Sequence, residues 1–286
     1  MDNIVKSNFV KLKPTLFLIP IIILLVIVGI LFYFGDLNAK GYVEIQKPYF
    51  YLINSDLSQF PATMLNLTQL GDAMIMLSFF TILIVYAPKF WEALLTSSLL
   101  SLIPCGLLKN LFAIPRPAAV FDHNSFTILG KVLTGHNSLP SGHSITIFTV
   151  LTVSMFAFLP KGTFYKIVRI GLMLLLGYAF SFTRVGVGAH YPLDVITGSV
   201  IGFMVGLTGI FITRKYNIWS WLFSVKFYPI FILAFSVSCF ILVKKILHQE
   251  LFIYYLAMTS LLISIFKLTH VYFKKTFAVN SVYDNN

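Results

Sequence analysis

Three short polar segments interrupt a largely apolar sequence of 286 residues, and they carry the charged and reactive side chains that could do chemistry. The first segment, K-N-L-F-A-I-P-R-P, contains Lys109 and Arg116. The second, P-S-G-H, places Ser141, Gly142 and His143 directly before an apolar run. Taken alone, basic residues at a membrane boundary commonly extend toward lipid headgroups, and a Pro-Ser-Gly turn can simply cap a helix. A helix N-terminus also directs free backbone N–H groups at a nearby anion.

The third polar segment, T-R-V-G-V-G-A-H-Y-P-L-D, contains Arg184, His190 and Asp194. If Tyr191 and Pro192 open a helix, the spacing of His190 and Asp194 puts both side chains on one face. A carboxylate in that position can fix the tautomer of the imidazole and raise its basicity. A purely structural hydrogen bond between the two residues is the alternative.

The combination of the three segments indicates one reaction centre. Two histidines and three cations would meet at the same membrane face, where ionisable residues are costly and usually functional. Three fixed cations neutralise a phosphoryl group, while two histidines can divide the roles of nucleophile and general acid. The sequence has no His, Cys or carboxylate cluster typical of a catalytic metal, and Cys105 and Cys239 both fall in apolar runs. We therefore expect metal-free phosphoryl transfer without a cofactor.

The three segments resemble the signature of the type 2 phosphatidic acid phosphatase (PAP2) superfamily, which reads K-x6-RP, PSGH and SR-x5-H-x3-D. Lys109 to Pro117 matches the first part, Pro140 to His143 the second, and Arg184, His190 and Asp194 the third. Thr183 stands where the pattern has Ser, and it retains the hydroxyl group. The resemblance covers about residues 60–213.

The resemblance implies a role for each matching residue. His190 is expected to attack phosphorus and form a phosphohistidine, with Asp194 orienting its ring. His143 is expected to protonate the leaving group and then to activate water. The phosphoryl oxygens are expected to be bound by Lys109, Arg116, Arg184, Ser141 and the backbone N–H of Gly142. Lys131, His123 and His136 have no position in the motif and are interpreted as loop residues, of which Lys131 or His136 could touch a substrate headgroup.

The composition of the chain indicates an integral membrane protein. Hydrophobic residues make up 58%, charged residues only 11%, and the mean hydropathy is +0.86. Soluble domains carry about 25% charged residues, so a water-soluble globular fold and intrinsic disorder are both excluded. The net charge of +11 comes without any run of Lys and Arg, which argues against nucleic acid as a partner.

The apolar segments predict an all-α membrane protein with a six-helix PAP2-type core and an extra C-terminal helical hairpin, about eight helices in total. The expected helices lie near residues 15–34, 70–87, 91–112, 144–160, 165–186, 192–213, 228–247 and 250–268. The first is interpreted as an uncleaved transmembrane helix because it is longer than the apolar part of a signal peptide. The expected organisation is an N-terminal helix and outer loop (1–60), a catalytic core (61–215), a helix pair (216–275) and a polar tail (276–286).

The distribution of basic residues predicts the orientation. With the N-terminus in the cytoplasm, thirteen of the 21 Lys and Arg residues fall on the inner side, although Lys244 and Lys245 oppose this bias. The three polar segments then face outward. The predicted location is a bacterial inner membrane with the site toward the periplasm or exterior.

The function expected from this reading is hydrolysis of a phosphomonoester or pyrophosphate of an envelope lipid. Candidate substrates are undecaprenyl pyrophosphate, lipid A phosphate, phosphatidylglycerophosphate and phosphatidic acid. A lipid phosphotransferase that uses the same phosphohistidine is one alternative. A transporter of anionic lipids is another, but it leaves His143 and His190 without a purpose, and the sequence has no evident inverted repeats. A catalytically inactive scaffold is disfavoured because every motif residue except Ser at position 183 is present.

Overall fold

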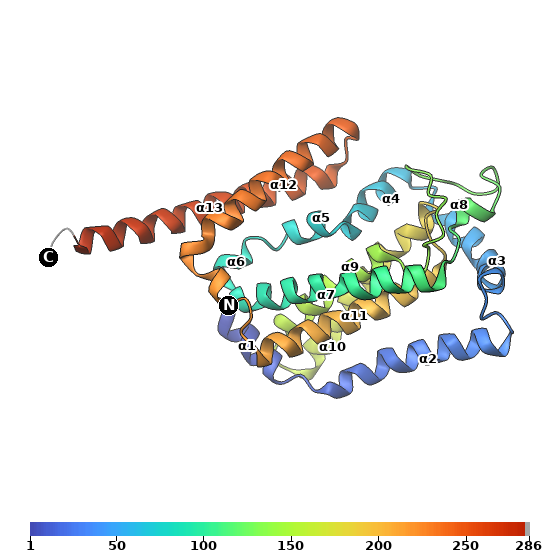
Figure 1. The fold of residues 1–286 in the computed structure, drawn as a ribbon, viewed down its shortest axis with the longest axis horizontal. Helices are drawn as coiled ribbons and strands as arrows, with labels where there is room; N and C mark the ends of the chain where they lie inside the picture. The colour runs from blue at the N-terminus through green and yellow to red at the C-terminus, as the bar shows by residue number, and fades with distance from the viewer. Residues whose placement is uncertain (284–286) are drawn as a thin grey trace.

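The computed structural model describes residues 1–283, with side chains through residue 276, and this part of the chain is helical without any strand. Figure 1 shows a bundle of long helices and a C-terminal hairpin. Between them runs a segmented stretch, the row of short helices over residues 61–86. The N-terminal half comprises α1 (Asp2–Val10), η1 (Pro14–Phe17), α2 (Leu18–Tyr33), α3 (Ala39–Leu57), α4 (Pro61–Thr68), η2 (Gln69–Gly71), α5 (Ala73–Ser78), α6 (Leu83–Tyr86), α7 (Pro88–Phe112) and α8 (Pro117–Val120). The C-terminal half comprises α9 (Gly142–Ala157), α10 (Thr163–Gly186), α11 (Pro192–Lys215), η3 (Ser220–Phe223), η4 (Val225–Phe227), α12 (Tyr228–His248) and α13 (Phe252–Tyr283).

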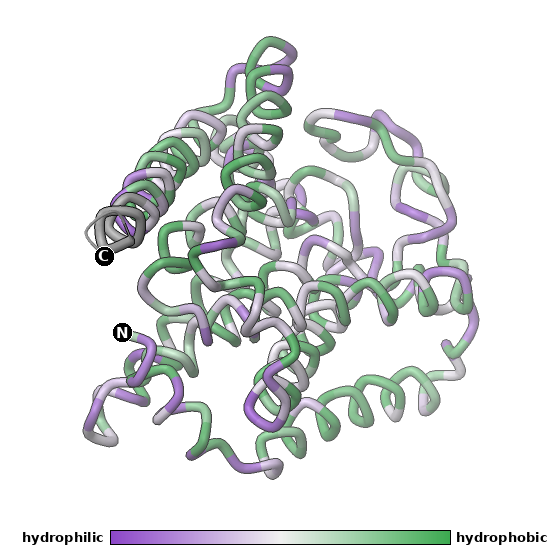
Figure 2. The backbone as a smooth tube through the Cα atoms, turned by 60° about the vertical axis from the view of Figure 1, so that its left-hand side comes forward, coloured by the Kyte–Doolittle hydropathy of each residue, from purple (hydrophilic) through white to green (hydrophobic). Residues whose placement is uncertain are grey.

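Within the described residues, six helical stretches are long and apolar enough to cross a membrane, which confirms the predicted all-α membrane fold. They are Pro14–Tyr33, Pro88–Val120, Thr163–Gly186, Pro192–Lys215, Val225–His248 and Phe252–Thr276. Each contains most or all of one of the predicted helices. The helix predicted near 144–160 is present as α9, which is apolar but shorter. Figure 2 shows hydrophobic residues along the long helices and hydrophilic residues mainly at their ends and in the connections.

The segment predicted as one helix over 70–87 is instead divided. Helix α5 ends at Ser78, turns follow, and α6 starts at Leu83. Backbone carbonyls left free by such a break must find partners inside a membrane protein. The carbonyl of Ser78 accepts from the hydroxyl groups of Thr81 and Ser260, and the carbonyl of Phe80 accepts from the indole N–H of Trp91. Side chains of α7 and α13 therefore stabilise the interruption, and hydropathy could not reveal it.

Helix α3 was not predicted, because an amphipathic helix contains no continuous apolar run. Its buried face consists of Tyr42, Val43, Gln46, Phe50 and Asn54, whereas its charged side chains are exposed. The amide of Asn54 donates to the carbonyls of Thr127, Val185 and Gly186. This helix therefore packs on the ends of the bundle helices, as interfacial helices do.

Glycines set the close approach of α9 and α11. Gly198, Gly202 and Gly206 recur every fourth residue and face α9. A Cβ atom on Gly202 would lie 2.5 Å from the carbonyl oxygen of Ile145, and one on Gly198 would lie 2.6 Å from that of Ser141. Helices in membranes associate through such small residues, since lipid supplies no hydrophobic driving force between them. The glycine seam therefore fixes the P-S-G-H segment relative to the start of α11.

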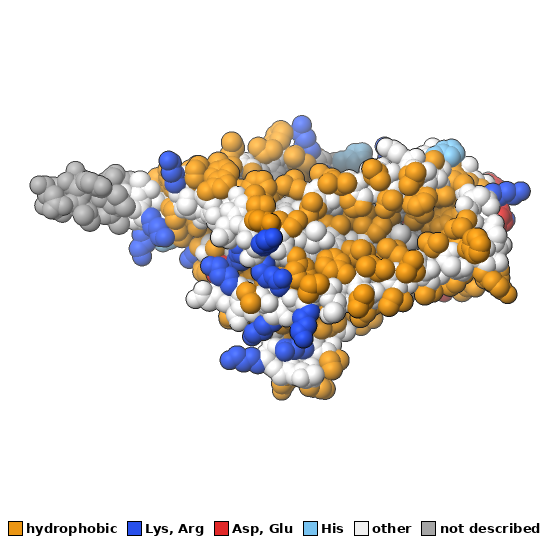
Figure 3. All heavy atoms as spheres, turned by 60° about the horizontal axis from the view of Figure 1, so that its bottom comes forward, with side chains coloured by type: hydrophobic (Ala, Val, Ile, Leu, Met, Phe, Trp, Pro, Cys, Tyr) orange, Lys and Arg blue, Asp and Glu red, His pale blue; other side chains and the backbone are white. Residues whose placement is uncertain are grey.

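The segments that are predicted to face the cytoplasm lie together at the N-terminal end of the molecule. The amide of Asn8 in α1 donates to the carbonyls of Ala157 and Leu159, and the guanidinium of Arg214 donates to the carbonyl of Leu12. On the face drawn in Figure 3, Lys and Arg side chains cluster toward one end, beside a long hydrophobic flank.

The C-terminal hairpin is formed by α12 and α13. Its turn is attached to the segmented stretch, because Lys245 Nζ lies 2.8 Å from Asp72 Oδ2 and the backbone N–H of Ile253 donates to Asn66 Oδ1. Helix α13 continues to Tyr283, so it extends well beyond the predicted end at residue 268. The last three residues of the predicted polar tail, 284–286, lie outside the described residues. Cys105 and Cys239 are both free and half-buried.

Candidate active site

The predicted site residues come from the ends of four helices and the turns beside them. Lys109 lies in the last turn of α7 and Arg184 in that of α10, while Arg116 directly precedes α8. Ser141, Gly142 and His143 open α9, and His190 and Asp194 flank the start of α11. Two contacts join these segments: Arg116 Nη1 lies 3.4 Å from His190 Nε2, and the Ser141 N–H donates to the carbonyl of Asp194. A Cβ atom on Gly142 would lie 3.6 Å from Lys109 Nζ, so this cation also faces the start of α9.

The carboxylate of Asp194 is fully buried and held on both oxygens. Its Oδ2 accepts from the hydroxyl group of Ser138 at 2.6 Å and from the backbone N–H of Tyr191 at 2.9 Å, and it lies 3.3 Å from His190 Nδ1. Its Oδ1 accepts from the hydroxyl group of Tyr42 at 2.8 Å. These four partners fix the carboxylate in the position from which it orients the imidazole.

The surroundings of His190 define its tautomer. Arg116 donates from Nη1 to the carbonyl of Ala189 and faces His190 Nε2, and Arg116 Nε donates to Asn137 Oδ1. A guanidinium has donors only, so Nε2 must present a lone pair to it. The ring proton then lies on Nδ1, toward Asp194. This arrangement leaves the lone pair of His190 on Nε2, facing Arg116.

The pKa of His190 is well below its ordinary value of 6.5. Burial is the largest cause, and the positive charges of Arg116, Arg184 and Lys109 add to it. Each cause disfavours the charged imidazolium. At neutral pH His190 is therefore neutral, which is the form that can attack an electrophile.

Arg184 has a donor that no neighbour uses. Its side chain is 8% exposed, and Nη1 donates to the hydroxyl group of Thr68 at 2.8 Å. Its Nε is buried and has no hydrogen-bond partner among the described residues. Buried donors almost always have a partner, so this one favours an acceptor supplied by a ligand, as a phosphoryl oxygen would be.

His143 occupies the first turn of α9 and is half-buried. It makes no hydrogen bond with the described part of the chain, and the charges of Arg184, Lys109 and Arg116 act on it as they do on His190. Gly71 lies directly against its ring, because a Cβ atom at that position would overlap the side chain of His143. The imidazole is thus held by packing and keeps both nitrogens available.

The hydroxyl group of Ser141 is used locally. It caps α9 by accepting from the backbone N–H and the hydroxyl group of Ser144, and Ser141 is fully buried. Its predicted contact with a phosphoryl oxygen stays a prediction. Gly142 is the first residue of α9 and is half-buried, and the predicted contact of its backbone N–H with a phosphoryl oxygen also stays a prediction. The hydroxyl group of Thr183 donates to the carbonyl of Phe180 within α10, so Thr in place of Ser does not alter the site through a hydrogen bond.

Several residues around the site were not predicted. Tyr42, Thr68, Asn137 and Ser138 each bond to a predicted site residue. Asn137 and Ser138 directly precede the P-S-G-H segment, and that adjacency is the signal that could have pointed to them. Tyr42 and Thr68 are distant in sequence, and only the fold brings them to the site.

The three loop residues outside the motif are in different environments. His123 Nε2 bonds the carbonyl of Ala118 at 2.8 Å, and His136 is exposed without a bonding partner in the described chain. Lys131 is exposed and lines a cavity of about 750 Å³ that Arg184 also lines. No group of three or more His, Cys, Asp or Glu side chains that could hold a metal occurs in the part of the chain that the structure describes.

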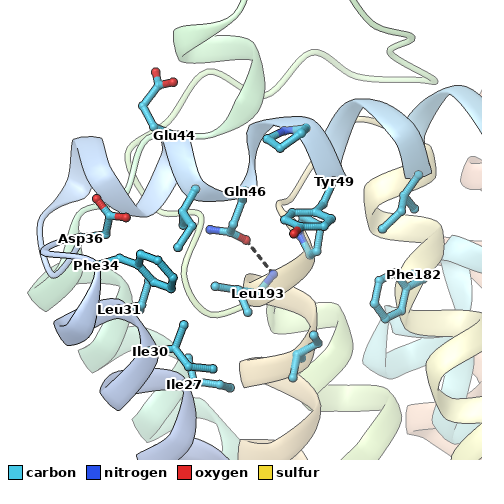
Figure 4. A pocket seen from close by; sticks show the side chains of 15 residues that line it. Ile27, Ile30, Leu31, Phe34, Asp36, Glu44, Gln46, Tyr49, Phe182 and Leu193 are labelled. Carbon is cyan, nitrogen blue, oxygen red and sulfur yellow. Dashed lines mark hydrogen bonds between the residues drawn. The ribbon is translucent and has the colours of Figure 1, made fainter.

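A separate cavity of about 720 Å³ lies between α2, α3 and the start of α11 (Figure 4). Its wall is mainly apolar, with Ile27, Ile30, Leu31 and Phe34 on one side. Gln46 of α3 reaches across and accepts from the backbone N–H of Leu193 at 2.7 Å. Helix α3 therefore fixes the first turn of α11 twice, through Gln46 and through Tyr42.

The fold and the site together define a class of protein. It is a polytopic helical membrane protein in which a buried His–Asp pair lies among three cations. Residues 90–221 match the family model of the PAP2 superfamily, and all of the predicted site residues lie within this match. The resemblance drawn from the sequence is confirmed.

Two curated proteins from Rhizobium are similar to this chain. A lipid A 1-phosphatase of Rhizobium etli is 35% identical over 112 residues, which are 38% of this chain and 44% of the relative. A lipid A 1-phosphatase of Rhizobium johnstonii is 36% identical over 100 residues, which are 34% of this chain and 37% of the relative. The chain thus spans less than half the length of the curated relatives it matches. The crystal structure of Aquifex aeolicus LpxE aligns with a TM-score of 0.48 at 26% identity, covering 60% of this chain and 96% of that one.

Proposed function

We propose that this protein is a membrane lipid phosphatase that hydrolyses a phosphomonoester or pyrophosphate through a phosphohistidine at His190. The observation that carries the proposal is the position of His190, whose Nδ1 faces a fixed carboxylate while Nε2 faces the guanidinium of Arg116. A phosphoryl group bound by that guanidinium would lie in front of the lone pair of Nε2. Such positioning, combined with fixed positive charge, supplies most of the catalysis in phosphoryl transfer.

The first step forms a bond between Nε2 of His190 and phosphorus while the bond from phosphorus to the leaving oxygen breaks. The proton on Nδ1 stays hydrogen-bonded to Asp194, which stabilises the positive charge that develops on the ring. A phosphoryl dianion bound among the three cations offsets their charge and favours the protonated form of His143. His143 then donates this proton to the departing oxygen, so a lipid alkoxide or phosphate leaves in its protonated form. Lys109, Arg116 and Arg184 compensate the charge on the phosphoryl oxygens.

The second step returns the enzyme to its initial state. His143, now neutral, takes a proton from a water molecule, whose oxygen attacks phosphorus. The bond from phosphorus to Nε2 breaks, and its electron pair returns to the ring of His190. Inorganic phosphate is released and His143 is protonated again, so the cycle balances without a metal or cofactor.

The substrates proposed are undecaprenyl pyrophosphate, lipid A phosphate, phosphatidylglycerophosphate and phosphatidic acid. The names of the two Rhizobium relatives favour lipid A phosphate among them. We also propose a bacterial inner membrane, with the site toward the periplasm or exterior. The clustering of basic residues around the opposite, N-terminal end supports this orientation, because cytoplasmic segments are enriched in Lys and Arg.

The experiment is a release assay with purified protein in detergent, in excess EDTA, on a panel of these lipids and on an activated aryl phosphate. We expect inorganic phosphate from at least one lipid, and no loss of activity to the chelator. Loss in EDTA that magnesium or zinc restores would contradict the site. Transfer of phosphate to an added lipid alcohol, without release, would assign the protein as a phosphotransferase.

Two variants separate the roles of the histidines. His190→Ala should be inactive on both the lipid and the aryl phosphate, because every substrate needs the nucleophile. His143→Ala should fail on the lipid but still form phosphoenzyme from the aryl ester, whose leaving group needs no proton. The opposite pattern would exchange the two roles.

A further inference from the structure

We infer that the turn of the C-terminal hairpin and the loop around Lys131 form a headgroup site for a hydroxyl-rich leaving group that carries a second anionic group. This inference rests on the proposed function, since the site adjoins Arg184. It would narrow the substrate class to phosphorylated glycolipids or polyol lipids. It would also give α12 and α13 a role beyond membrane anchoring.

The first observation is the cavity of about 750 Å³ that Arg184 lines. Its volume lies within the range of pockets that hold drug-sized molecules, and it is far larger than a phosphoryl group requires. Its wall combines the last turn of α10, the loop around Lys131, helix η2 and the end of α12. All of these segments lie at the end of the bundle that carries the site, where a lipid headgroup rather than an acyl chain resides.

The second observation is the chemistry of the lining. Arg184 and Thr68 lie on the phosphoryl side, and Lys131 and His248 add basic groups contributed by other elements. The amides of Gln69 and Gln249 offer both donors and acceptors, as hydroxyl groups require. Lys131 has no ion-pair partner within the described residues. A cation without a carboxylate partner, beside a partly polar cavity, is suited to a second anionic group of the ligand.

The third observation is that the hairpin turn is fixed in place. Lys245 Nζ pairs with Asp72 Oδ2 at 2.8 Å, and the N–H of Ile253 donates to Asn66 Oδ1 at 3.0 Å. Leu251 between them is 5% exposed. His248 and Gln249 are therefore held over η2 by contacts on either side of the turn, as a preorganised binding wall would be.

The cavity adjoins the side from which the leaving group departs. Helix η2 contributes Gln69 to its wall and packs Gly71 against the ring of His143, the proposed general acid, so we infer that the cavity receives the part of the substrate that leaves. Phosphatidic acid leaves an apolar diacylglycerol, which makes no use of Lys131, Gln69 or Gln249. A glycolipid with phosphates at two distant positions places sugar hydroxyl groups in the cavity and the second phosphate near Lys131.

The test compares Lys131→Gln and His248→Ala on three substrates: a diphosphorylated disaccharide lipid (lipid A), the same lipid with only the scissile phosphate, and an aryl phosphate. We expect Lys131→Gln to lower kcat/KM for the diphosphorylated lipid by about tenfold, the effect of losing one charge-assisted hydrogen bond. The singly phosphorylated lipid and the aryl phosphate should change by less than about twofold. His248→Ala should impair both glycolipids and leave the aryl phosphate unaffected.

Matched controls are Lys40→Gln and His270→Ala, which change exposed residues of the same types that do not line the cavity. They should leave all three activities unchanged. Equal effects of Lys131→Gln on all three substrates, or no effect on any, would overturn the inference.

A binding measurement keeps the inference separate from the proposed function. The affinity of the His190→Ala protein for the diphosphorylated lipid is measured in detergent, with and without Lys131→Gln. Weakening by about tenfold supports the headgroup site even if no substrate is hydrolysed, and unchanged affinity refutes it. A wild-type protein that binds the lipid but releases no phosphate from any substrate contradicts the proposed function alone.

Discussion

The hydroxyl group of Tyr42 donates to Asp194 Oδ1 at 2.8 Å, so a helix outside the sequence motifs fixes the residue that orients His190. Both side chains are buried. The pKa of Tyr42 is well above its ordinary value because of burial and the adjacent charge of Asp194. Tyr42 therefore remains a donor over the working pH range.

Replacing Tyr42 with Phe removes this donor and keeps the ring. We expect kcat to fall by about tenfold on both lipid and aryl substrates with little change in KM, because the carboxylate loses one of its fixed partners. The measurement is steady-state kinetics, with rapid quenching to show slower formation of phosphoenzyme. Tyr49→Phe on the exposed side of the same helix is the control and should match the wild type. An unchanged rate in Tyr42→Phe would remove Tyr42 from the positioning of Asp194.

A substitution at Gly71, which lies outside the motifs, tests the role of His143. In Gly71→Ala the added methyl group overlaps the ring of His143, so the imidazole must move. We expect kcat on a lipid phosphate to fall by about a hundredfold, as for a general acid removed from its position, and the aryl ester to be affected less. Gly106→Ala is the control, because nothing lies within 4 Å of its added Cβ. An equal loss on both substrates would indicate that the substitution disturbs more than His143.

The pH dependence follows from the lowered pKa of His190. Burial, then Arg116, Arg184 and Lys109, all favour the neutral ring, so kcat/KM should not fall as the pH is lowered through 6.5. It should fall only when the pH approaches the lower pKa of the folded protein. In the unfolded chain the ring binds a proton near pH 6.5, so the contribution of this residue to stability is fully present above that pH and is lost below it.

Arg184→Gln tests whether His190 controls the acidic limb of kcat/KM, because it predicts the direction in which that limb moves. Removing a positive charge raises the pKa of His190, so the acidic limb of kcat/KM should move to higher pH, alongside an overall loss of rate. The profile is measured with the aryl phosphate, which limits the influence of His143. A limb that stays in place, or moves to lower pH, would show that another group controls it.

The glycine seam between α9 and α11 carries a prediction about stability. Gly202→Ala places a methyl group 2.5 Å from the carbonyl oxygen of Ile145, so the two helices must separate. We expect a loss of about 1–3 kcal/mol, typical of overpacking, seen as a lower thermal unfolding temperature in detergent. Gly171→Ala in α10, with nothing within 4 Å of the added Cβ, should not lower it. A stable Gly202→Ala would mean that the interface adapts without cost.

The motif residues could be predicted from the sequence because their chemistry and order are local properties. Arg116, His190 and Asp194 were named from two short segments, and the structure joins them in one chain of contacts. The transmembrane helices were found for a similar reason, since an apolar run of sufficient length has one stable form in a bilayer.

The parts that sequence reasoning missed depend on distant partners. The interruption after Ser78 is stabilised by side chains of Trp91 and Ser260, which no local pattern connects to it. Helix α3 lacks an apolar run, and the contact of Tyr42 with Asp194 spans 152 residues of sequence. Hydropathy and motif spacing contain no information about such pairs.

The ion pair between Asp72 and Lys245 has a consequence for biogenesis. Its two partners are 173 residues apart, so Asp72 is synthesised and inserted long before Lys245 leaves the ribosome. Chains fold progressively from the N-terminus during synthesis. The phosphoryl-binding centre can therefore assemble first, while the wall that carries His248 and Gln249 arrives only with the final hairpin. With the headgroup site that we infer, selectivity would be acquired at the last stage of maturation, and an assembly intermediate would discriminate less between lipids than the finished enzyme.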